Sequence, residues 1–321
     1  MREPLPDWPL FGMTDDVRPA LAATSAAGVP SALATLTKVE GGGPRPAGTQ
    51  MVFADGVTAG YFSGGCVEAD VASHAWDCLS DGEPRRLVYG EGSPWPDIRL
   101  LCGARIEIFV EKVEADDPAL AALLAAKAAR NSVVWISDGH KRACVAPGSA
   151  QAWDGAISRR HDPVTRLVVF GSDPTALAIA QLGAQSGLET TLVRPKGPDS
   201  SPPIPGLGYR REAPAAALAA IGVDPWTAIA VATHDLETDQ AALRVALPSP
   251  ASYVGLLGAR ARLPERVARL KAAGVTDAAI GRLHAPIGLP VGGKAPWEVA
   301  VSVIGEVMAE RLKALAPVIP G

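Results

Sequence analysis

The chain has 321 residues, a net charge of −4 and a hydrophobic content of 48%. This length predicts two domains of ordinary size, and the lack of a basic block argues against a nucleic-acid partner. The longest alanine-rich run, 213–223, is too short to span a bilayer, and the first residues are too polar and proline-rich for a signal peptide. Four cysteines without a paired or zinc-binding pattern are typical of a reducing compartment, so we expect a cytoplasmic protein.

In the first half of the chain, predicted strands alternate with glycine-rich loops. A strand over 31–39 leads into the loop 41–48, where Arg45 stands between two prolines. Asp55-Gly56, between two extended runs, predicts a hairpin. A rigidly presented arginine suits a phosphate or a carboxylate, and a solvated arginine on a turn is an equal alternative at this point.

The segment that follows the hairpin carries the strongest chemical signal. Gly64 and Gly65 precede Cys66, and the apolar spacing from 67 to 79 predicts a helix. The unpaired amides at a helix start, next to glycines, form a nest for an anion, and the helix dipole favours the Cys66 thiolate. Gly65 and Glu68 have the spacing of an N-cap and its third helical residue. The alternative is a tight turn followed by a buried structural cysteine.

A second cysteine-glycine pair, Cys102-Gly103, lies just before an alternating strand over 105–110. A helix is predicted over 118–129. A second hairpin over 132–145 is expected to extend the first domain's sheet, and the polar stretch 147–162 is expected to be the linker.

From residue 166 onward, short apolar strands alternate with helices. This pattern predicts a parallel sheet covered on both faces, as in Rossmann-like domains. The fold class is therefore α/β, with an N-terminal mixed α/β domain over 13–160 and a C-terminal Rossmann-like domain over 165–318. The predicted strands are 167–170, 189–193, 227–232 and 252–256, and the predicted helices are 174–186, 214–221, 239–247, 264–273 and 296–315.

The first strand-helix turn of this half is a poor dinucleotide site. It reads Gly171-Ser172-Asp173, so an acid replaces the central glycine, and Asp173 is expected to cap the helix that a pyrophosphate would use. Arg194 stands where an acid usually binds the ribose, which would suit only a 2′-phosphate. His234 and His284 lie in loops after later strands. Each is either a ligand-binding residue or an ordinary hydrogen-bonded loop histidine.

Taken in order, these motifs resemble the XdhC/CoxI family of accessory proteins for molybdenum hydroxylases, and the resemblance covers nearly the whole chain. Three segments depart from the usual pattern of the family: the turn at Asp173, the segment that begins at Arg194, and Ala104 in place of a second glycine. The matching segments are 44–48, Ser63-Gly64-Gly65-Cys66-Val67-Glu68, Cys102-Gly103, Thr233-His234-Asp235, Tyr253-Val254-Gly255 with Leu257-Gly258-Ala259-Arg260, and His284-Ala285-Pro286-Ile287-Gly288-Leu289.

The resemblance implies a cytoplasmic protein, often dimeric, that binds molybdenum cofactor and delivers it to a xanthine or aldehyde dehydrogenase-type apoenzyme. A cysteine desulfurase would supply the terminal sulfur ligand, and the cofactor would be molybdopterin or its dinucleotide form. Cys66 is the expected metal ligand. The residues expected to bind the cofactor are Arg45, Gly64, Gly65, Cys66, Glu68, Cys102, Gly103, His234, Asp235, Arg260 and His284.

Two enzymatic alternatives stay open beside this non-catalytic role. The Rossmann-like half could belong to an NAD(P)-dependent oxidoreductase, which Asp173 disfavours. Cys66 and His234 could form a cysteine hydrolase site, which would require residues of the two predicted domains to meet. Neither a membrane partner nor a nucleic acid is expected.

Overall fold

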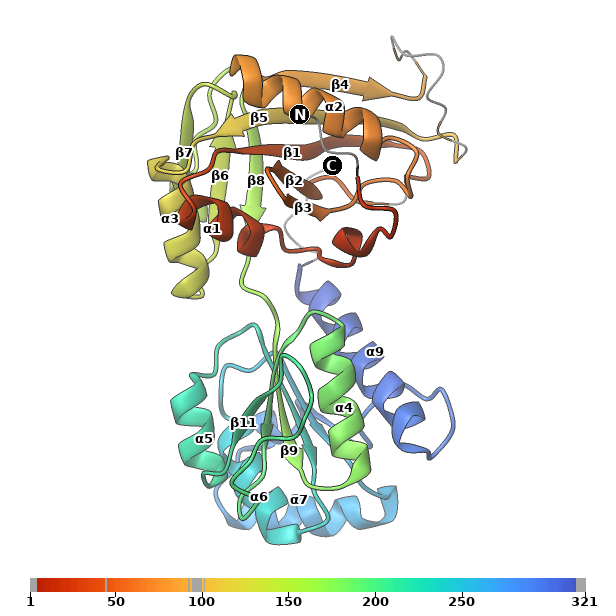
Figure 1. Cartoon of the computed structure of the whole chain (residues 1–321). Coiled ribbons are helices and arrows are strands. Elements are labelled where there is room, and N and C mark those ends of the chain that lie inside the picture. Colours follow the sequence, from red (N-terminus) through yellow and green to blue (C-terminus); the bar gives the residue numbers. More distant parts are fainter. Residues whose placement is uncertain (1–4, 44, 92, 94–99, 101, 316–321) are drawn as a thin grey trace. The chain divides into compact units, whose positions relative to one another are not determined.

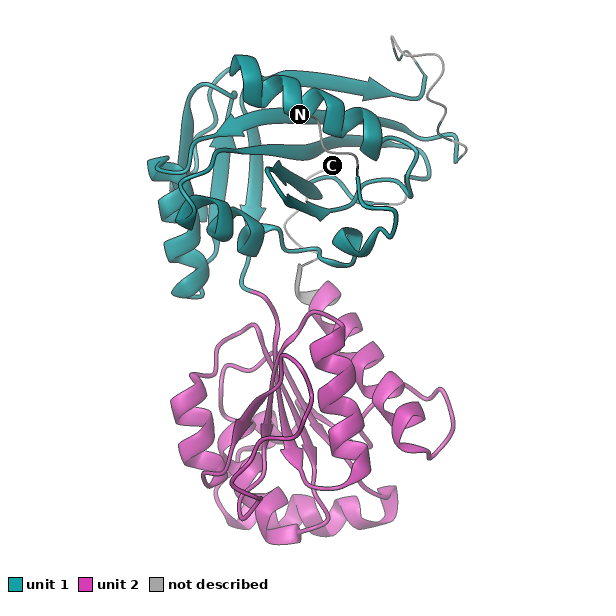
Figure 2. Cartoon of the chain, viewed as in Figure 1, with its two compact units in different colours: residues 1–163 teal, residues 164–321 magenta. Residues whose placement is uncertain are grey.

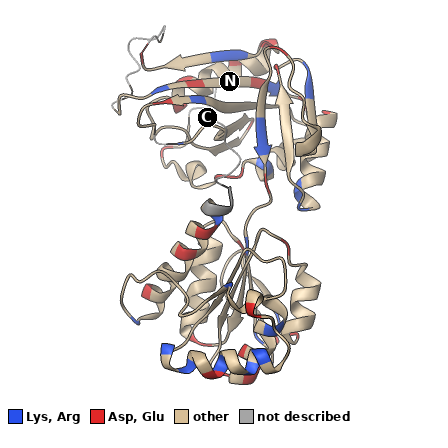
Figure 3. Cartoon of the chain, turned by 180° about the vertical axis from the view of Figure 1, so that it is seen from behind, with Lys and Arg blue, Asp and Glu red and all other residues tan. Residues whose placement is uncertain are grey.

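The computed structural model describes residues 5–43, 45–91, 93, 100 and 102–315, with residues 313–315 described for their backbone only (Figure 1). The chain divides into two compact units, residues 1–163 and 164–321 (Figure 2). Acidic and basic residues are interspersed over both units (Figure 3). None of the described helices has the length and apolar character needed to cross a membrane.

Unit 1 is built on a five-stranded antiparallel sheet with the order β3-β2-β1-β5-β4. The hairpin predicted at Asp55-Gly56 is confirmed, since Ala54 pairs with Val57 across that turn. The strands are β1 (Ser31–Glu40), β2 (Gln50–Ala54), β3 (Val57–Gly60), β4 (Arg85–Tyr89) and β5 (Arg105–Val113).

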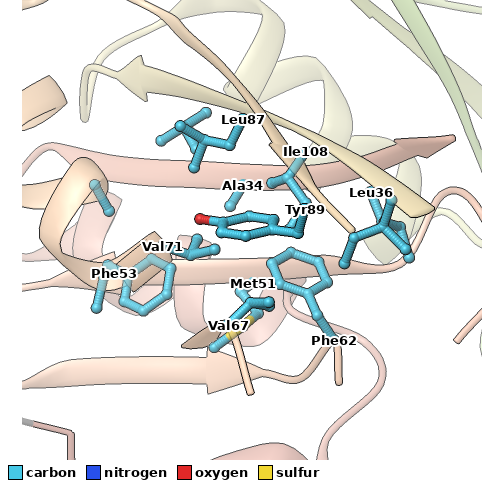
Figure 4. Close-up of a cluster of buried hydrophobic side chains, with 14 of the residues drawn as sticks. Ala34, Leu36, Met51, Phe53, Phe62, Val67, Val71, Leu87, Tyr89 and Ile108 are labelled. Carbon is cyan, nitrogen blue, oxygen red and sulfur yellow. The ribbon is translucent and has the colours of Figure 1, made fainter. Parts of the chain in front are cut away.

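The sheet of unit 1 is buried on both faces. Helix α2 (Glu68–Asp81) packs on one face, where the core includes Tyr89 and Phe62 (Figure 4). Helices α1 (Arg18–Ala26) and α3 (Pro118–Ala128) contribute to the cluster on the other face, together with Leu33 and Trp135. Because successive side chains of a strand point to opposite faces, β1 supplies Ala32, Ala34 and Leu36 to one core and Leu33 to the other.

A separate three-stranded sheet completes unit 1, which corrects two expectations. Its order is β7-β6-β8, with β6 (Val133–Ser137), β7 (Arg142–Val145) and β8 (Ile157–His161). The second hairpin therefore does not extend the first sheet, and the expected linker contains a strand. Charged residues hid β8 from the sequence pattern, although its end residues Ile157 and His161 are buried. The fully buried Glu111 of β5 joins the two sheets, because Trp135 Nε1 donates to its carboxylate at 3.0 Å.

Unit 2 contains a six-stranded parallel sheet with the order β11-β10-β9-β12-β13-β14. With the strands numbered within this unit, the order is 3-2-1-4-5-6, which is that of a Rossmann fold and confirms the predicted class. The strands are β9 (Arg166–Gly171), β10 (Glu189–Val193), β11 (Gly208–Arg210), β12 (Thr227–Ala232), β13 (Tyr253–Leu256) and β14 (Leu283–His284).

Helices cover both faces of this sheet, as the continuous apolar strands predicted. Helices α4 (Pro174–Gln185) and α9 (Pro296–Leu315) form one core with the sheet. Helices α5 (Pro214–Ile221), α6 (Leu236–Ala246) and α7 (Leu263–Ala272) form the other. The chain after β9 and the chain after β12 thus leave toward opposite faces. This arrangement creates a crevice at their carboxyl ends, the usual ligand position in such folds.

Candidate functional site

Three of the loops singled out in the sequence meet at one end of the five-stranded sheet. Strand register places them there: Glu40 pairs with Arg105, and Met51 pairs with Gly60. The loops 41–49, 61–67 and 102–104 therefore all lie at the same end of the strands. A Cβ atom on Gly41 would lie 3.4 Å from the carbonyl oxygen of Gly103. Arg45, the Gly64–Glu68 segment and Cys102-Gly103 thus share one region of unit 1.

A single carboxylate organises the loop that carries Cys66. Glu68 is 2% exposed, and its Oε1 accepts from the amides of Phe62 at 3.0 Å and Ser63 at 2.6 Å. Its Oε2 accepts from the Ser63 hydroxyl at 2.7 Å, the Gly65 amide at 2.9 Å and the Val67 amide at 3.3 Å. The Ser63 hydroxyl oxygen in turn accepts from the Cys66 amide at 3.1 Å. The loop is wound around the side chain of Glu68.

This geometry changes the expected role of the two glycines. Gly64 and Gly65 have φ values of 107° and 96°, which only glycine adopts without strain, so they allow the tight turn. The amides expected to receive a ligand's anion are already bonded within the chain, and the expectation of an open nest is wrong for them. Val67, not Gly65, is the N-cap of α2. The signal in the sequence was the spacing of Gly65 and Glu68, which allows the Glu68 side chain to reach back and accept from the Gly65 amide.

The ionised form of Glu68 is the one that the loop stabilises. Burial alone would raise the pKa of this carboxyl. The hydrogen bonds from Ser63, from the amide of Glu68 itself and from Phe62 outweigh burial and lower the pKa below its ordinary value. The first turn of α2 adds to this, because a helix N-terminus favours negative charge.

Two of the four thiols are accessible at this end of the sheet. Cys66 and Cys102 are exposed, whereas Cys78 is fully buried on α2, as expected for a core residue. Burial raises the pKa of Cys78, and it raises the pKa of Cys144 to about 11. In the described part of the chain, no His, Asp or Glu is hydrogen-bonded to the Cys66 sulfur, and no group of three or more potential metal ligands occurs. Cys66 is therefore presented as a single soft sulfur on a rigid loop.

Arg45 has a partner of its own in the structure. Its guanidinium forms an ion pair with Asp15, whose side chain is 75% exposed. An exposed ion pair contributes little to stability and can be exchanged for another anion. The role expected for Arg45 toward a phosphate stays a prediction.

In unit 2, His234 and Asp173 meet across the crevice between β9 and β12. Asp173 caps α4 as predicted, with Oδ1 accepting from the Ala176 amide at 2.8 Å. Its Oδ2 lies 2.8 Å from His234 Nε2. A carboxylate and its histidine partner thus occupy the turn where a pyrophosphate would bind. Asp235 caps α6, and the hydrogen bond from the Thr238 hydroxyl lowers its pKa.

His284 lies elsewhere on the same sheet, in β14 beside Gly255 of β13. Its Nδ1 is 3.1 Å from the carboxylate of Glu306 on α9, which also accepts from Tyr253 Oη at 2.5 Å and the Gly288 amide at 2.7 Å. Glu306, which the sequence analysis missed, ties α9 to the edge of the sheet. The exposed Arg260 follows β13 in a short 3₁₀ turn, Arg260–Arg262. The predicted residues of unit 2 therefore lie at the carboxyl ends of three neighbouring strands, β12, β13 and β14.

Comparison with known proteins decides the family. The model of the XdhC and CoxI family matches residues 24–90, and that of the XdhC Rossmann domain matches 167–307. A relative from Escherichia coli, the molybdenum cofactor insertion chaperone PaoD, is 30% identical over 94% of this chain and 90% of its own length. The chain belongs to the XdhC and CoxI family.

Two further relatives agree with this membership. A Bacillus subtilis protein, named as a probable component of xanthine dehydrogenase, is 27% identical over 87% of this chain and 92% of that protein. A solved structure from Bacillus halodurans, described as a xanthine dehydrogenase, has a TM-score of 0.76 and covers 95% of this chain and 98% of that chain. Its sequence identity is 22%, so it shows a common fold with this XdhC/CoxI protein.

The Glu68 carboxylate should be a major source of stability for unit 1. Glu68→Gln removes the charge and points an amide group at other donors, so we expect a loss of about 3 kcal/mol in the free energy of unfolding. Because the folded pKa is lowered, the contribution of Glu68 is complete above the unfolded pKa of about 4.3 and disappears as pH falls through the folded value. Urea titrations from neutral to acidic pH measure both effects. Glu83→Gln, at a 70% exposed side chain, is the control, and equal stability of the two variants at neutral pH would contradict the prediction.

The crevice of unit 2 should bind NAD weakly or not at all. Calorimetry should give dissociation constants above about 1 mM for NAD and NADH, because Asp173 uses the helix start. Asp173→Gly should gain phosphate affinity at a cost of about 1 kcal/mol for the lost cap. Asp235→Gly removes the equivalent cap of α6 and controls for that cost. Micromolar NAD binding by the unaltered protein would revive the oxidoreductase alternative, and NADP binding alone would indicate Arg194 as the partner of the 2′-phosphate.

Proposed function

We propose that this protein binds molybdenum cofactor, protects it while its molybdenum gains a sulfur ligand, and delivers it to an apoenzyme of the xanthine or aldehyde dehydrogenase type. The observation that carries the proposal is the exposed thiol of Cys66 on a loop fixed by Glu68, in a chain that belongs to the XdhC and CoxI family. The relative PaoD is named as an insertion chaperone for the same cofactor.

The chemistry of the cargo suits the chemistry of this loop. Molybdenum cofactor presents a thiophilic metal and a phosphate, so it needs a soft ligand and a cation or free donors. Cys66 supplies the soft ligand. Because Glu68 already accepts from the loop amides, we assign it a positioning role and assign the phosphate to Arg45, whose present partner Asp15 is exposed.

The partners follow from the same proposal. The client is a molybdenum hydroxylase apoenzyme, and the sulfur donor is a cysteine desulfurase that transfers sulfur while the cofactor is held. We propose that the protein acts as a homodimer in the cytoplasm and performs no turnover of its own. Six more residues are proposed as contacts of the cargo or of its nucleotide portion: Cys102, Gly103, His234, Asp235, Arg260 and His284.

Purified protein should retain about one molybdenum cofactor per chain. Ultrafiltration with cofactor released from a molybdenum enzyme measures this, with serum albumin as the control. Metal content and the absorption spectrum of protein made in a molybdenum-replete host give a second readout. Retention no greater than that of albumin would refute cofactor binding.

Cys66 should matter more than the other three cysteines. Cys66→Ser removes the soft ligand but leaves the Glu68 bonds in place, so affinity for the cofactor should fall by at least about tenfold while stability is unchanged. Cys102→Ser alters the other exposed thiol at the same end of the sheet, and because Cys102 is proposed as a secondary contact, the affinity should fall by less than in Cys66→Ser. Activation of a client apoenzyme should follow the same order. If Cys66→Ser retains the cofactor as the wild type does and Cys102→Ser does not, then Cys102 is the metal ligand and Cys66 is not.

A further inference from the structure

Strand β8 places an arginine beside the loop that carries Arg45. Arg159 lies on the same face of β8 as the buried Ile157 and His161, because alternate residues of a strand share a face. Its side chain packs against the loop, since a Cβ atom on Gly48 would lie 3.0 Å from Arg159 Cδ and 3.1 Å from Nε. Strand β8 lies outside both segments that match the family models, so this similarity assigns Arg159 no role.

Arg159 carries a charge that no acidic side chain of the described residues neutralises. Its one hydrogen bond in this part of the chain goes from Nη1 to the carbonyl oxygen of Arg160. Its Nε is fully buried without a partner, whereas Nη2 also lacks a partner but is accessible to solvent. The acids of this region already pair with three other arginines: Asp15 with Arg45, Asp16 with Arg18 at 2.7 Å, and Asp162 with Arg160 at 2.8 Å.

The surroundings of Arg159 make this unpaired charge unfavourable. Burial lowers the pKa of Arg159, and the charge of Arg18 lowers it further, while Asp162 and Asp16 act in the opposite direction without offsetting burial. His161 adds no positive charge at pH 7, because burial, Arg159 and Arg18 hold its pKa well below the ordinary value. An anion at Arg159 would supply the missing negative charge and stabilise the pair.

Two other arginines bring further unpartnered donors to the same region. Arg18 is 4% exposed, and its Nε and Nη2 bind Asp16 while Nη1 is fully buried without a partner. The Nε of Arg45 is likewise buried without a partner. The segment 15–18 connects the two, because Asp15 pairs with Arg45. Guanidinium groups with free buried donors are typical of a site for an oxyanion, whose oxygens accept several hydrogen bonds.

We propose that Arg159 and Arg45 together bind the phosphate group of the cargo, and that Arg18 is a positioning residue of this site. A phosphate monoester carries up to two negative charges, so it can neutralise Arg159 and replace Asp15 at Arg45. Arg18 fixes the segment 15–18 to the end of β8, because its Nη2 donates to the carbonyl oxygen of Asp162 at 3.0 Å. The inference rests on the proposed function only in naming the cofactor as the source of the phosphate.

Calorimetry of the full chain with inorganic phosphate tests the site without the cofactor. The wild type should bind phosphate with a dissociation constant of about 1 mM or lower, measured against chloride at the same ionic strength. Arg159→Gln should weaken this binding by about tenfold or more. Arg160→Gln is the matched control, because it removes the same charge from the other face of β8, where Asp162 is already the partner, and its affinity should stay within about twofold of the wild type.

The stability of the same variants separates a binding role of Arg159 from a structural one. Without phosphate, Arg159→Gln should keep or raise the urea midpoint, because it removes an unpaired charge. Arg160→Gln should lower the midpoint slightly, because it breaks the pair with Asp162. Added phosphate should raise the midpoint of the wild type more than that of Arg159→Gln, whose remaining rise measures the unspecific effect of the salt.

Three outcomes would overturn the proposal in different ways. No phosphate binding by the wild type at about 20 mM, or equal affinity of Arg159→Gln, would remove the site. A lower midpoint of Arg159→Gln with unchanged phosphate binding would make Arg159 a structural residue. Cofactor retention by Arg159→Gln equal to that of the wild type would exclude the cargo as the source of the phosphate. If the wild type binds phosphate through Arg159 but retains no cofactor, the proposed function fails while the oxyanion site stands.

Discussion

The candidate site depends on one buried carboxylate. Glu68 begins α2 and reaches back to the chain before it, so that the amides of Phe62, Ser63, Gly65 and Val67 converge on its two oxygens. Two glycines at positive φ make this path possible, and the Ser63 hydroxyl links the carboxylate to the Cys66 amide. The helix, the hairpin before it and the exposed thiol are thereby fixed relative to each other by hydrogen bonds to a charged group, which are stronger than those between neutral groups.

Local patterns in the sequence predicted the structure correctly wherever interactions between residues close in sequence determine it. Asp55-Gly56 determined the hairpin, and the apolar strands of the second half determined a parallel sheet covered on both faces. Asp173 was recognised as a cap because its side chain needs only the next turn of its own helix. Strand β8 was missed because its charged side chains suppress the apolar pattern, and its pairing with β6 is a long-range contact that no local pattern contains.

The site shows the same division between local and long-range information. The sequence correctly placed Cys66 on a glycine-rich loop at a helix start. The amides of such a loop suit an external anion and an internal carboxylate equally well, so the predicted anion nest could not be told from an internal carboxylate site. The Gly65–Glu68 spacing was visible, yet only the structure shows both oxygens of Glu68 occupied. Likewise, neither the Asp15 partner of Arg45 nor the Asp173 partner of His234 could be read from spacing, because each pair joins distant segments.

These contacts divide the proposed tasks among different groups. Because Glu68 and Ser63 occupy the loop amides, the loop can offer an incoming cofactor its sulfur but few free donors. Recognition of a phosphate then requires a cation whose present partner is easily replaced, and the Arg45–Asp15 pair meets this condition because Asp15 is largely exposed. In the second unit, the Asp173–His234 pair opposes a pyrophosphate at the usual position. The Rossmann architecture is retained there while its ordinary nucleotide turn is altered, which disfavours hydride transfer from a dinucleotide bound at that turn.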